Sequence, residues 1–245
     1  MHIVYTAALL AALLFGGTGT ALAAASLTKG EIVYDLNGNK GKLHVGESIM
    51  PVHGANLVYV ELNAEQAKAM GKPENTLLFF DKAGACTAEL AGDKNENPSA
   101  VFASPKGDIL AVDAGTWVIR DWIFFAYPSM KPLERRISYL SRDKDDLIWA
   151  GDDAIIITTI KERSPRQCGF DPCDPRSVDL YSIRGDKSTS LFAGTDLCDY
   201  TFDSFDGKTV RALKSCVKNL GDWNAENFEA LEKLQTKDIV ARALP

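Results

Sequence analysis

The sequence predicts an all-β protein, and two observations carry this prediction. Nine short runs of apolar or alternating residues recur along the chain, bounded by Gly, Asn, Asp or Pro and rich in β-branched and aromatic side chains. Runs of this length and composition are typical of strands. The second observation is that helix signals are few. The nine predicted strands are Glu31–Leu36, Leu57–Leu62, Leu77–Asp81, Ala100–Ser104, Ile109–Asp113, Trp122–Tyr127, Ala154–Ile160, Val178–Ile183 and Thr209–Val217.

Two segments carry helix signals. Asn63 and Gln66 stand at the two positions of a reciprocal capping box, which predicts a helix over Ala64–Met70. A second helix is predicted from Asn224 to about Gln235, because its apolar residues share one face. We therefore expect residues 222–245 to form a helical extension.

Two series of similar segments alternate along the chain. Those of the first series begin with a small or turn residue and enter an apolar run; they start 53, 46 and 54 residues apart, at Gly54, Gly107, Asp153 and Gly207. Those of the second series lie between them, and three end at a glycine turn; they are residues 32–38, 78–84, 123–128 and 180–185. The alternation has no exception, and an element of the second series comes first.

This alternation predicts a propeller-like domain over residues 26–221. An inner strand pair followed by an outer pair makes one four-stranded blade of about 40–50 residues, so the spacing indicates about four blades. The chain begins with an outer pair near residues 31–46 and ends with an inner pair near 198–217. We expect these N- and C-terminal strands to close the ring as one composite blade, because closure removes exposed sheet edges.

In this alternation the sequence resembles the broad class of WD40-like and kelch-like β-propeller repeat proteins. The resemblance covers most of the chain and implies a propeller fold. The Trp-Asp, Gly-His and double-glycine signatures of those repeats are absent from the sequence. A β-sandwich is the alternative fold, because turn signals roughly every 8–12 residues fit it equally well.

Composition and charge exclude several classes of protein. Hydrophobic residues make up 46% and charged residues 24%, which are values of ordinary globular domains rather than of disordered chains or collagen. Acidic residues outnumber basic ones by 33 to 27, and the pI is near 5.2. A net charge of −6 argues against a nucleic-acid partner and against attraction to anionic lipid.

The first 25 residues have the features of a secretory signal peptide. Residues 3–15 are apolar and uncharged, and A-x-A sites predict cleavage after Ala23 or Ala25. The apolar stretch is shorter than the roughly 20 residues that span a bilayer, so we expect no stable membrane insertion once it is removed. The predicted location is periplasmic or extracellular.

Export gives the five cysteines a structural interpretation, because an oxidising compartment lets pairs form. Cys168 and Cys173 enclose a turn-rich loop, and we expect them to pair. Cys198 and Cys216 flank the Asp206-Gly207 turn, where pairing requires a one-residue bulge or a loop longer than two residues. Cys86 is left over, and no metal site is predicted.

No motif of a known catalytic or cofactor site occurs in the sequence. After cleavage the remaining histidines are His44 and His53, and neither has an evident partner for acid–base work. Five acidic residues lie close together in the sequence: Asp143, Asp145, Asp146, Asp152 and Asp153. Two of them could lie on opposite sides of a glycosidic bond and catalyse its cleavage. The alternative is a solvated acidic turn.

Three other features have two interpretations each. Asp35, Asn37 and Asn39 alternate like the first ligands of an EF-hand calcium loop. However, Gly41 and Glu47 stand later than the glycine and the final acid of such a loop. An Asn-Gly hairpin turn is therefore favoured. The aromatic run 117–127 is either a ligand platform or a strand buried on both faces, and burial is favoured. The Cys168–Cys173 loop either staples an insertion or carries recognition.

The sequence therefore favours an exported, non-enzymatic protein that binds a protein, peptide or glycan through loops or the ring face, without a cofactor. A carboxylate-dependent polysaccharide hydrolase or lyase is one alternative. An inhibitor of a secreted enzyme, acting through the Cys168–Cys173 loop, is another.

Overall fold

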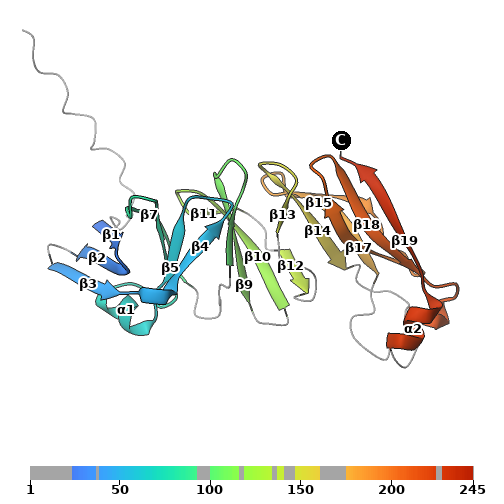
Figure 1. Cartoon of the computed structure of the whole chain (residues 1–245), viewed down its shortest axis with the longest axis horizontal. Helices are drawn as coiled ribbons and strands as arrows, with labels where there is room; N and C mark the ends of the chain where they lie inside the picture. The colour runs from blue at the N-terminus through green and yellow to red at the C-terminus, as the bar shows by residue number, and fades with distance from the viewer. Residues whose placement is uncertain are drawn as a thin grey trace, which may run out of the picture.

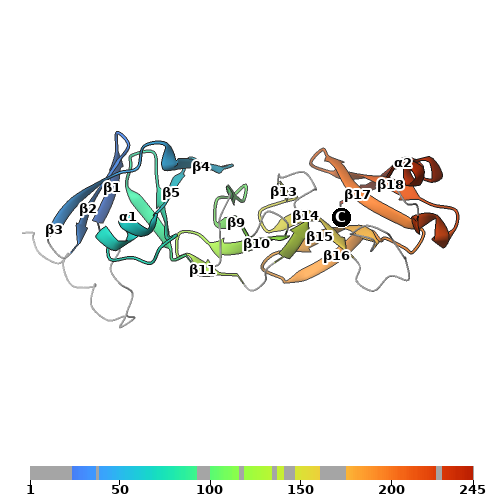
Figure 2. The same cartoon turned by 90° about the horizontal axis from the view of Figure 1, so that it is seen from below.

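The computed structural model describes residues 24–36, 39–92, 100–115, 119–133, 137–140, 147–160, 175–224 and 228–244. Within these ranges the chain is mostly strand, and its strands form five consecutive antiparallel units arranged in a row (Figures 1 and 2). The predicted all-β class is confirmed. No helix in the described ranges is long and apolar enough to span a membrane.

The units are numbered in chain order. Unit 1 holds β1 (Ala24–Thr28), β2 (Glu31–Leu36) and β3 (Asn39–His44). Unit 2 holds β4 (Ile49–His53), β5 (Val58–Glu61), β6 (Leu77–Phe80) and β7 (Cys86–Leu90). Unit 3 holds β8 (Ala100–Ala103), β9 (Ile109–Gly115), β10 (Ile119–Ala126), β11 (Lys131–Pro132) and β12 (Ile137–Leu140).

Unit 4 holds β13 (Ile148–Trp149), β14 (Ala154–Ile160), β15 (Arg176–Ser182) and β16 (Lys187–Phe192). Unit 5 holds β17 (Cys198–Phe205), β18 (Thr209–Cys216) and β19 (Thr236–Ala243). The helices of the described chain are η1 (Gly46–Ser48), α1 (Ala64–Ala69), η2 (Leu220–Asn224) and α2 (Phe228–Leu234).

The predicted alternation corresponds to equivalent strands of successive units. The first series forms the second strand of units 2 to 5, namely β5, β9, β14 and β18. Three members of the second series form the third strand of units 2 to 4, namely β6, β10 and β15. Units 2, 3 and 4 are each up-and-down meanders, as propeller blades are. The repeat is therefore structural.

Each unit packs against the next through an apolar core of its own, and four such cores lie between the five units. Strand β6 shows why its run is continuously apolar. Leu77 and Phe79 face the core shared with unit 3, and Leu78 and Phe80 face the core shared with unit 1. All four side chains are at most 1% exposed. Burial of one such side chain stabilises the fold by about 1.5–3 kcal/mol.

Strand pairing also links neighbouring units. Units 2 and 3 are joined by parallel pairing of β4 with β8, through Val52 with Val101 and His53 with Phe102. Unit 1 is tied to unit 2 by a backbone hydrogen bond of 2.7 Å from the Leu27 N–H to the Gly84 carbonyl.

The predicted closure of the ring is not what the structure shows. In the described chain, units 1 and 5 lie at opposite ends of the row, and no strand of one pairs with a strand of the other. The edge of β18 that the closure required is occupied by β19, along the register Thr209↔Ala243 to Cys216↔Thr236. Strand β19 was not expected, because most of its side chains are exposed and give no apolar signal. The helix before it, α2, lies within the predicted helix.

Candidate functional site

The predicted Cys198–Cys216 disulfide is present and joins directly opposed residues of β17 and β18. The two alternatives predicted for this pairing, a bulge and a longer loop, occur together. The register shifts between Phe202 and Ser204, which is a bulge, and the loop that follows Phe205 is longer than two residues. Cys168 and Cys173 lie outside the described residues, so their pairing stays a prediction. Cys86 carries a free thiol, and its burial raises the pKa of that thiol.

Neither histidine of the described chain is arranged as a base. The exposed ring of His53 stacks on Phe102 at 4.7 Å, and Phe102 in turn meets Trp122 edge-on at 5.4 Å. The backbone carbonyl of His44 accepts a hydrogen bond from Gln66 Nε2, which ties unit 1 to the first turn of α1. The capping box of Asn63 and Gln66 is also present, as predicted.

Of the five predicted acids, Asp143, Asp145 and Asp146 lie outside the described residues. Asp153 lies in a turn and accepts hydrogen bonds from the Arg184 N–H at 2.9 Å and from the Ser182 hydroxyl at 3.2 Å. The Arg184 guanidinium, 3.8 Å from the Asp153 carboxylate, donates a hydrogen bond to Asp108 of unit 3 at 2.8 Å. Asp153 therefore helps to join units 3 and 4, while its neighbour Asp152 is exposed.

The alternating residues 35–39 belong to a hairpin. Strands β2 and β3 pair up to Leu36↔Asn39, which encloses the Asn-Gly dipeptide, although residues 37 and 38 themselves lie outside the described ranges. No group of three or more His, Cys, Asp or Glu side chains suited to a metal gathers in the part of the chain that is described. The aromatic run contains strand β10, whose Trp122 and Phe124 face unit 4 and whose Ile123 and Phe125 face unit 2.

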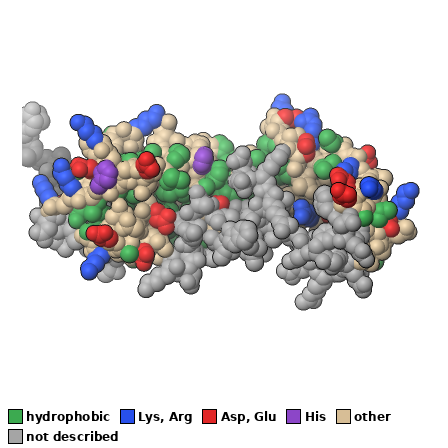
Figure 3. All heavy atoms as spheres, turned by 60° about the horizontal axis from the view of Figure 1, so that its bottom comes forward, with side chains coloured by type: hydrophobic (Ala, Val, Ile, Leu, Met, Phe, Trp, Pro, Cys, Tyr) green, Lys and Arg blue, Asp and Glu red, His purple; other side chains and the backbone are tan. Residues whose placement is uncertain are grey.

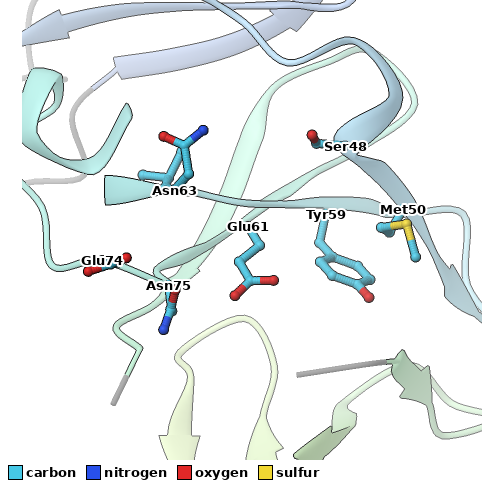
Figure 4. A pocket seen from close by; sticks show the side chains of 8 residues that line it. Ser48, Met50, Tyr59, Glu61, Asn63, Glu74 and Asn75 are labelled. Carbon is cyan, nitrogen blue, oxygen red and sulfur yellow. The ribbon is translucent and has the colours of Figure 1, made fainter. Parts of the chain in front are cut away.

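The structure brings together a different set of residues, in a cleft of about 360 Å³ on unit 2 (Figure 4). Its lining comes from η1 and β4, from β5 and the residues after it, and from the loop before β6. The lining residues are Ser48, Met50, Tyr59, Glu61, Leu62, Asn63, Glu74 and Asn75.

Strand β5 carries the two residues at the centre of the cleft. Tyr59 and Glu61 are two positions apart, so their side chains leave the same face of the strand, as Figure 4 shows. Tyr59 is only 3% exposed, with its ring near Phe79. Neither its hydroxyl nor the Glu61 carboxylate has a hydrogen-bond or ion-pair partner among the described residues. Tyr59 is thus a buried residue whose hydroxyl lines the cleft, and Glu61 is half-buried.

The loop before β6 is fixed rather than loose. The Asn75 N–H donates to the Leu62 carbonyl at 3.0 Å, and the Leu62 N–H donates to the Thr76 carbonyl at 2.9 Å. Asn75 has a φ of 62°, a conformation that asparagine tolerates better than most residues. Its side chain lines the cleft together with that of Glu61 (Figure 4). The side of the cleft opposite β4 is therefore preformed.

Burial in the cleft disfavours the charged forms of its two central groups. Burial raises the pKa of Glu61. Burial also raises the pKa of Tyr59, and the nearby carboxylates of Glu61 and Asp113 raise it further. No Lys, Arg or His lines the cleft. The site therefore holds hydrogen-bond acceptors and negative charge that nothing within the described chain neutralises.

The sequence did not point to this site. Tyr59 lies in a predicted strand and looks like a core residue, and Glu61 looks like the polar end of that strand. A weak signal was available, since a carboxylate that shares a face with a buried aromatic residue is unusual for a strand with apolar faces. The sequence around Asn75 carried no such signal, because the position of this residue depends on backbone hydrogen bonds between its loop and Leu62.

No protein-family model matches the chain, and no curated protein matches it. Among solved structures, the chain is similar to the β-propeller domain of the trilobed protease from Pyrococcus furiosus, described as having an open velcro topology. That match has 13% identity and a TM-score of 0.43, and it covers 86% of this chain and 60% of the other.

Two peptidases are also similar in structure. One of two prolyl endopeptidases matches with 16% identity and a TM-score of 0.45, over 81% of this chain and 35% of the other. The acylaminoacyl peptidase of Pyrococcus horikoshii matches with 11% identity and a TM-score of 0.43, over 87% and 34%. The chain thus spans less than two thirds of the length of each.

Proposed function

We propose that this chain is an exported, non-enzymatic binding module that recognises a segment of a protein or peptide through the cleft on unit 2. The observation that carries the proposal is the Tyr59 side chain: the residue is 3% exposed, and its hydroxyl has no partner in the described chain but lines the cleft. A ligand that pairs with this hydroxyl gains a hydrogen bond worth about 1 kcal/mol.

The setting of the cleft suits a peptide. Met50 is 42% exposed beside polar side chains, so the site offers an apolar contact and acceptors for N–H donors together. Figure 3 shows apolar and acidic side chains interspersed on the N-terminal half of the molecule. A glycan is less favoured, because the Tyr59 ring is buried and cannot stack on a sugar.

Selection from a random peptide library displayed on phage tests the proposal. We expect the full chain to enrich peptides, and we expect Tyr59→Phe to weaken their binding about 5- to 10-fold in fluorescence polarisation, since one hydrogen bond is worth about 1 kcal/mol. Tyr200→Phe in unit 5 is the matched control and should leave affinity unchanged. Failure to enrich any peptide, or equal affinity of wild type and Tyr59→Phe, would contradict the proposal.

Export is proposed together with cleavage after Ala23 rather than Ala25. Strand β1 begins at Ala24, and its first two residues pair with Asp35 and Tyr34 of β2. Cleavage after Ala25 would remove both pairs. Sequencing of the N-terminus of the secreted chain should therefore start at Ala24, and a start at Met1 would contradict export.

A further inference from the structure

We infer that the cleft on unit 2 binds a basic side chain of the partner, arginine in preference to lysine. This inference rests on the proposed function, because it names the chemical class of residue that the cleft selects. Three properties of the cleft support it: the negative charge of its lining, its hydrogen-bond acceptors and its exposed apolar side chain.

The charge of the lining is negative throughout. It contains the carboxylates of Glu61 and Glu74 and no basic side chain. Lys72, in the loop that leads to Glu74, is bonded instead to Glu89 of β7 at 2.6 Å. A carboxylate that is partly withdrawn from water and lacks a counterion is stabilised by a cationic ligand, whereas a phosphate or carboxylate ligand would be repelled.

The lining offers acceptors from separate positions around the Glu61 carboxylate. The Tyr59 side chain leaves the same strand face, and the Asn75 side chain comes from the loop before β6 (Figure 4). A guanidinium presents five N–H donors in a rigid plane, whereas an ammonium presents three and is more strongly hydrated. Several acceptors in a partly dry cleft therefore favour arginine over lysine.

An apolar contact is available for the stem of such a side chain. Met50 lines the cleft next to Tyr59, and its side chain is 42% exposed. Arginine and lysine lay their methylene groups along apolar surface while their charged heads reach polar partners. A neutral polar residue would use the acceptors but leave Glu61 without a counterion.

A thermodynamic cycle on peptides from the phage selection tests the inference. For a selected peptide we replace each arginine in turn by citrulline, which keeps the shape and removes the charge, or by lysine. At one position we expect citrulline to weaken binding to the wild-type full chain about 10-fold or more and lysine to weaken it less. With Glu61→Gln, the loss of affinity caused by replacing arginine with citrulline should largely disappear, because the arginine then has no carboxylate to pair with.

The controls separate this inference from the proposed function. Glu229→Gln changes an exposed acid on α2 and should leave the citrulline effect intact. Peptides that bind and depend on Tyr59, but tolerate citrulline at every position, would overturn the arginine inference and leave the proposed function standing. Loss of binding on addition of about 1 mM CaCl₂, with calcium binding to wild type but not to Glu61→Gln, would also overturn it, because a divalent cation would then be the ligand of the cleft.

Discussion

Glu61 and Tyr59 are positions where the sequence and the fold conflict. Both lie on strand β5, whose neighbours Val60 and Leu62 are fully buried. Tyr59 and Glu61 leave the opposite face of the strand, where a partly desolvated carboxylate without a counterion costs stability that an apolar side chain would not. Departures of this kind are expected at functional sites. This conflict is the physical reason to assign function to the cleft.

Replacing the carboxylate should therefore stabilise the free protein. At pH 7 we expect Glu61→Gln to raise the Tm by about 1–2 °C. Burial raises the pKa of Glu61 above its ordinary value of 4.5, so the folded chain binds protons more readily than the unfolded chain. Stability then falls as the pH rises from 4.5 through the raised pKa.

The advantage of Glu61→Gln should vanish below pH 4.5, where Glu61 is protonated in both states. Thermal unfolding followed by circular dichroism between about pH 4 and pH 8 measures this dependence. Glu229→Gln, at an exposed site, serves as the reference and should show no such trend. A lower Tm for Glu61→Gln than for wild type at pH 7 would contradict the account of the cleft.

At the scale of single elements, the hairpin between β6 and β7 links units 1 and 2. Gly84 has a φ of 80°, and a Cβ at this position would lie 2.1 Å from the Leu27 carbonyl oxygen. Its own carbonyl accepts the Leu27 N–H. Only glycine meets both requirements, namely the left-handed conformation and the close approach of β1.

Gly84→Ala should consequently destabilise the protein more than a matched glycine substitution does. Gly107 has a φ of 77°, and a Cβ added there would meet no atom within 4 Å, so Gly107→Ala costs the backbone strain alone, about 1 kcal/mol. We expect Gly84→Ala to cost about 1 kcal/mol more in urea unfolding and to speed hydrogen exchange of the Leu27 amide. Equal losses for the two variants would show that the contact with Leu27 contributes nothing.

The disulfide of unit 5 closes a loop between β17 and β18 with a sequence separation of 18 residues. For a loop of this length the restriction of the unfolded chain is worth about 3 kcal/mol. The Cys198→Ala/Cys216→Ala double variant should lose about that much stability in urea unfolding under oxidising conditions. A variant as stable as the oxidised wild type would contradict this expectation.

Sequence patterns were informative for elements that are buried on both faces and uninformative for the rest. All nine predicted strands are present, because runs such as Leu77–Asp81 must be apolar at nearly every position to meet two cores. Strands at unit edges were missed. In β16, for example, the side chains of residues 187–190 are exposed and carry no periodic apolar signal.

At the scale of the whole molecule, the repeat was predicted correctly and the closure was not. Spacing identifies equivalent strands, but it does not say which edge pairs with which. Here β19 pairs with the edge of β18, and the residue pattern of Thr236–Ala243 did not predict this strand. The cleft was missed for a related reason, since its lining is assembled from three segments between residues 48 and 75.

An open row of units should make the molecule elongated in solution. A compact domain of this length has a radius of gyration of about 17 Å. We expect small-angle X-ray scattering to give a clearly larger value for the secreted chain, with units 1 and 5 far apart as in Figure 1. A value near that of a compact domain would indicate that the two ends meet in solution.

Hydrogen exchange of the full chain, measured with and without a selected arginine-containing peptide, tests the central claim most directly. The account predicts that the peptide protects amides of residues 46–63 and 72–77 and leaves units 4 and 5 unchanged, and that Tyr59→Phe reduces the protection. Protection confined to units 4 and 5, with the cleft residues unaffected, would contradict it.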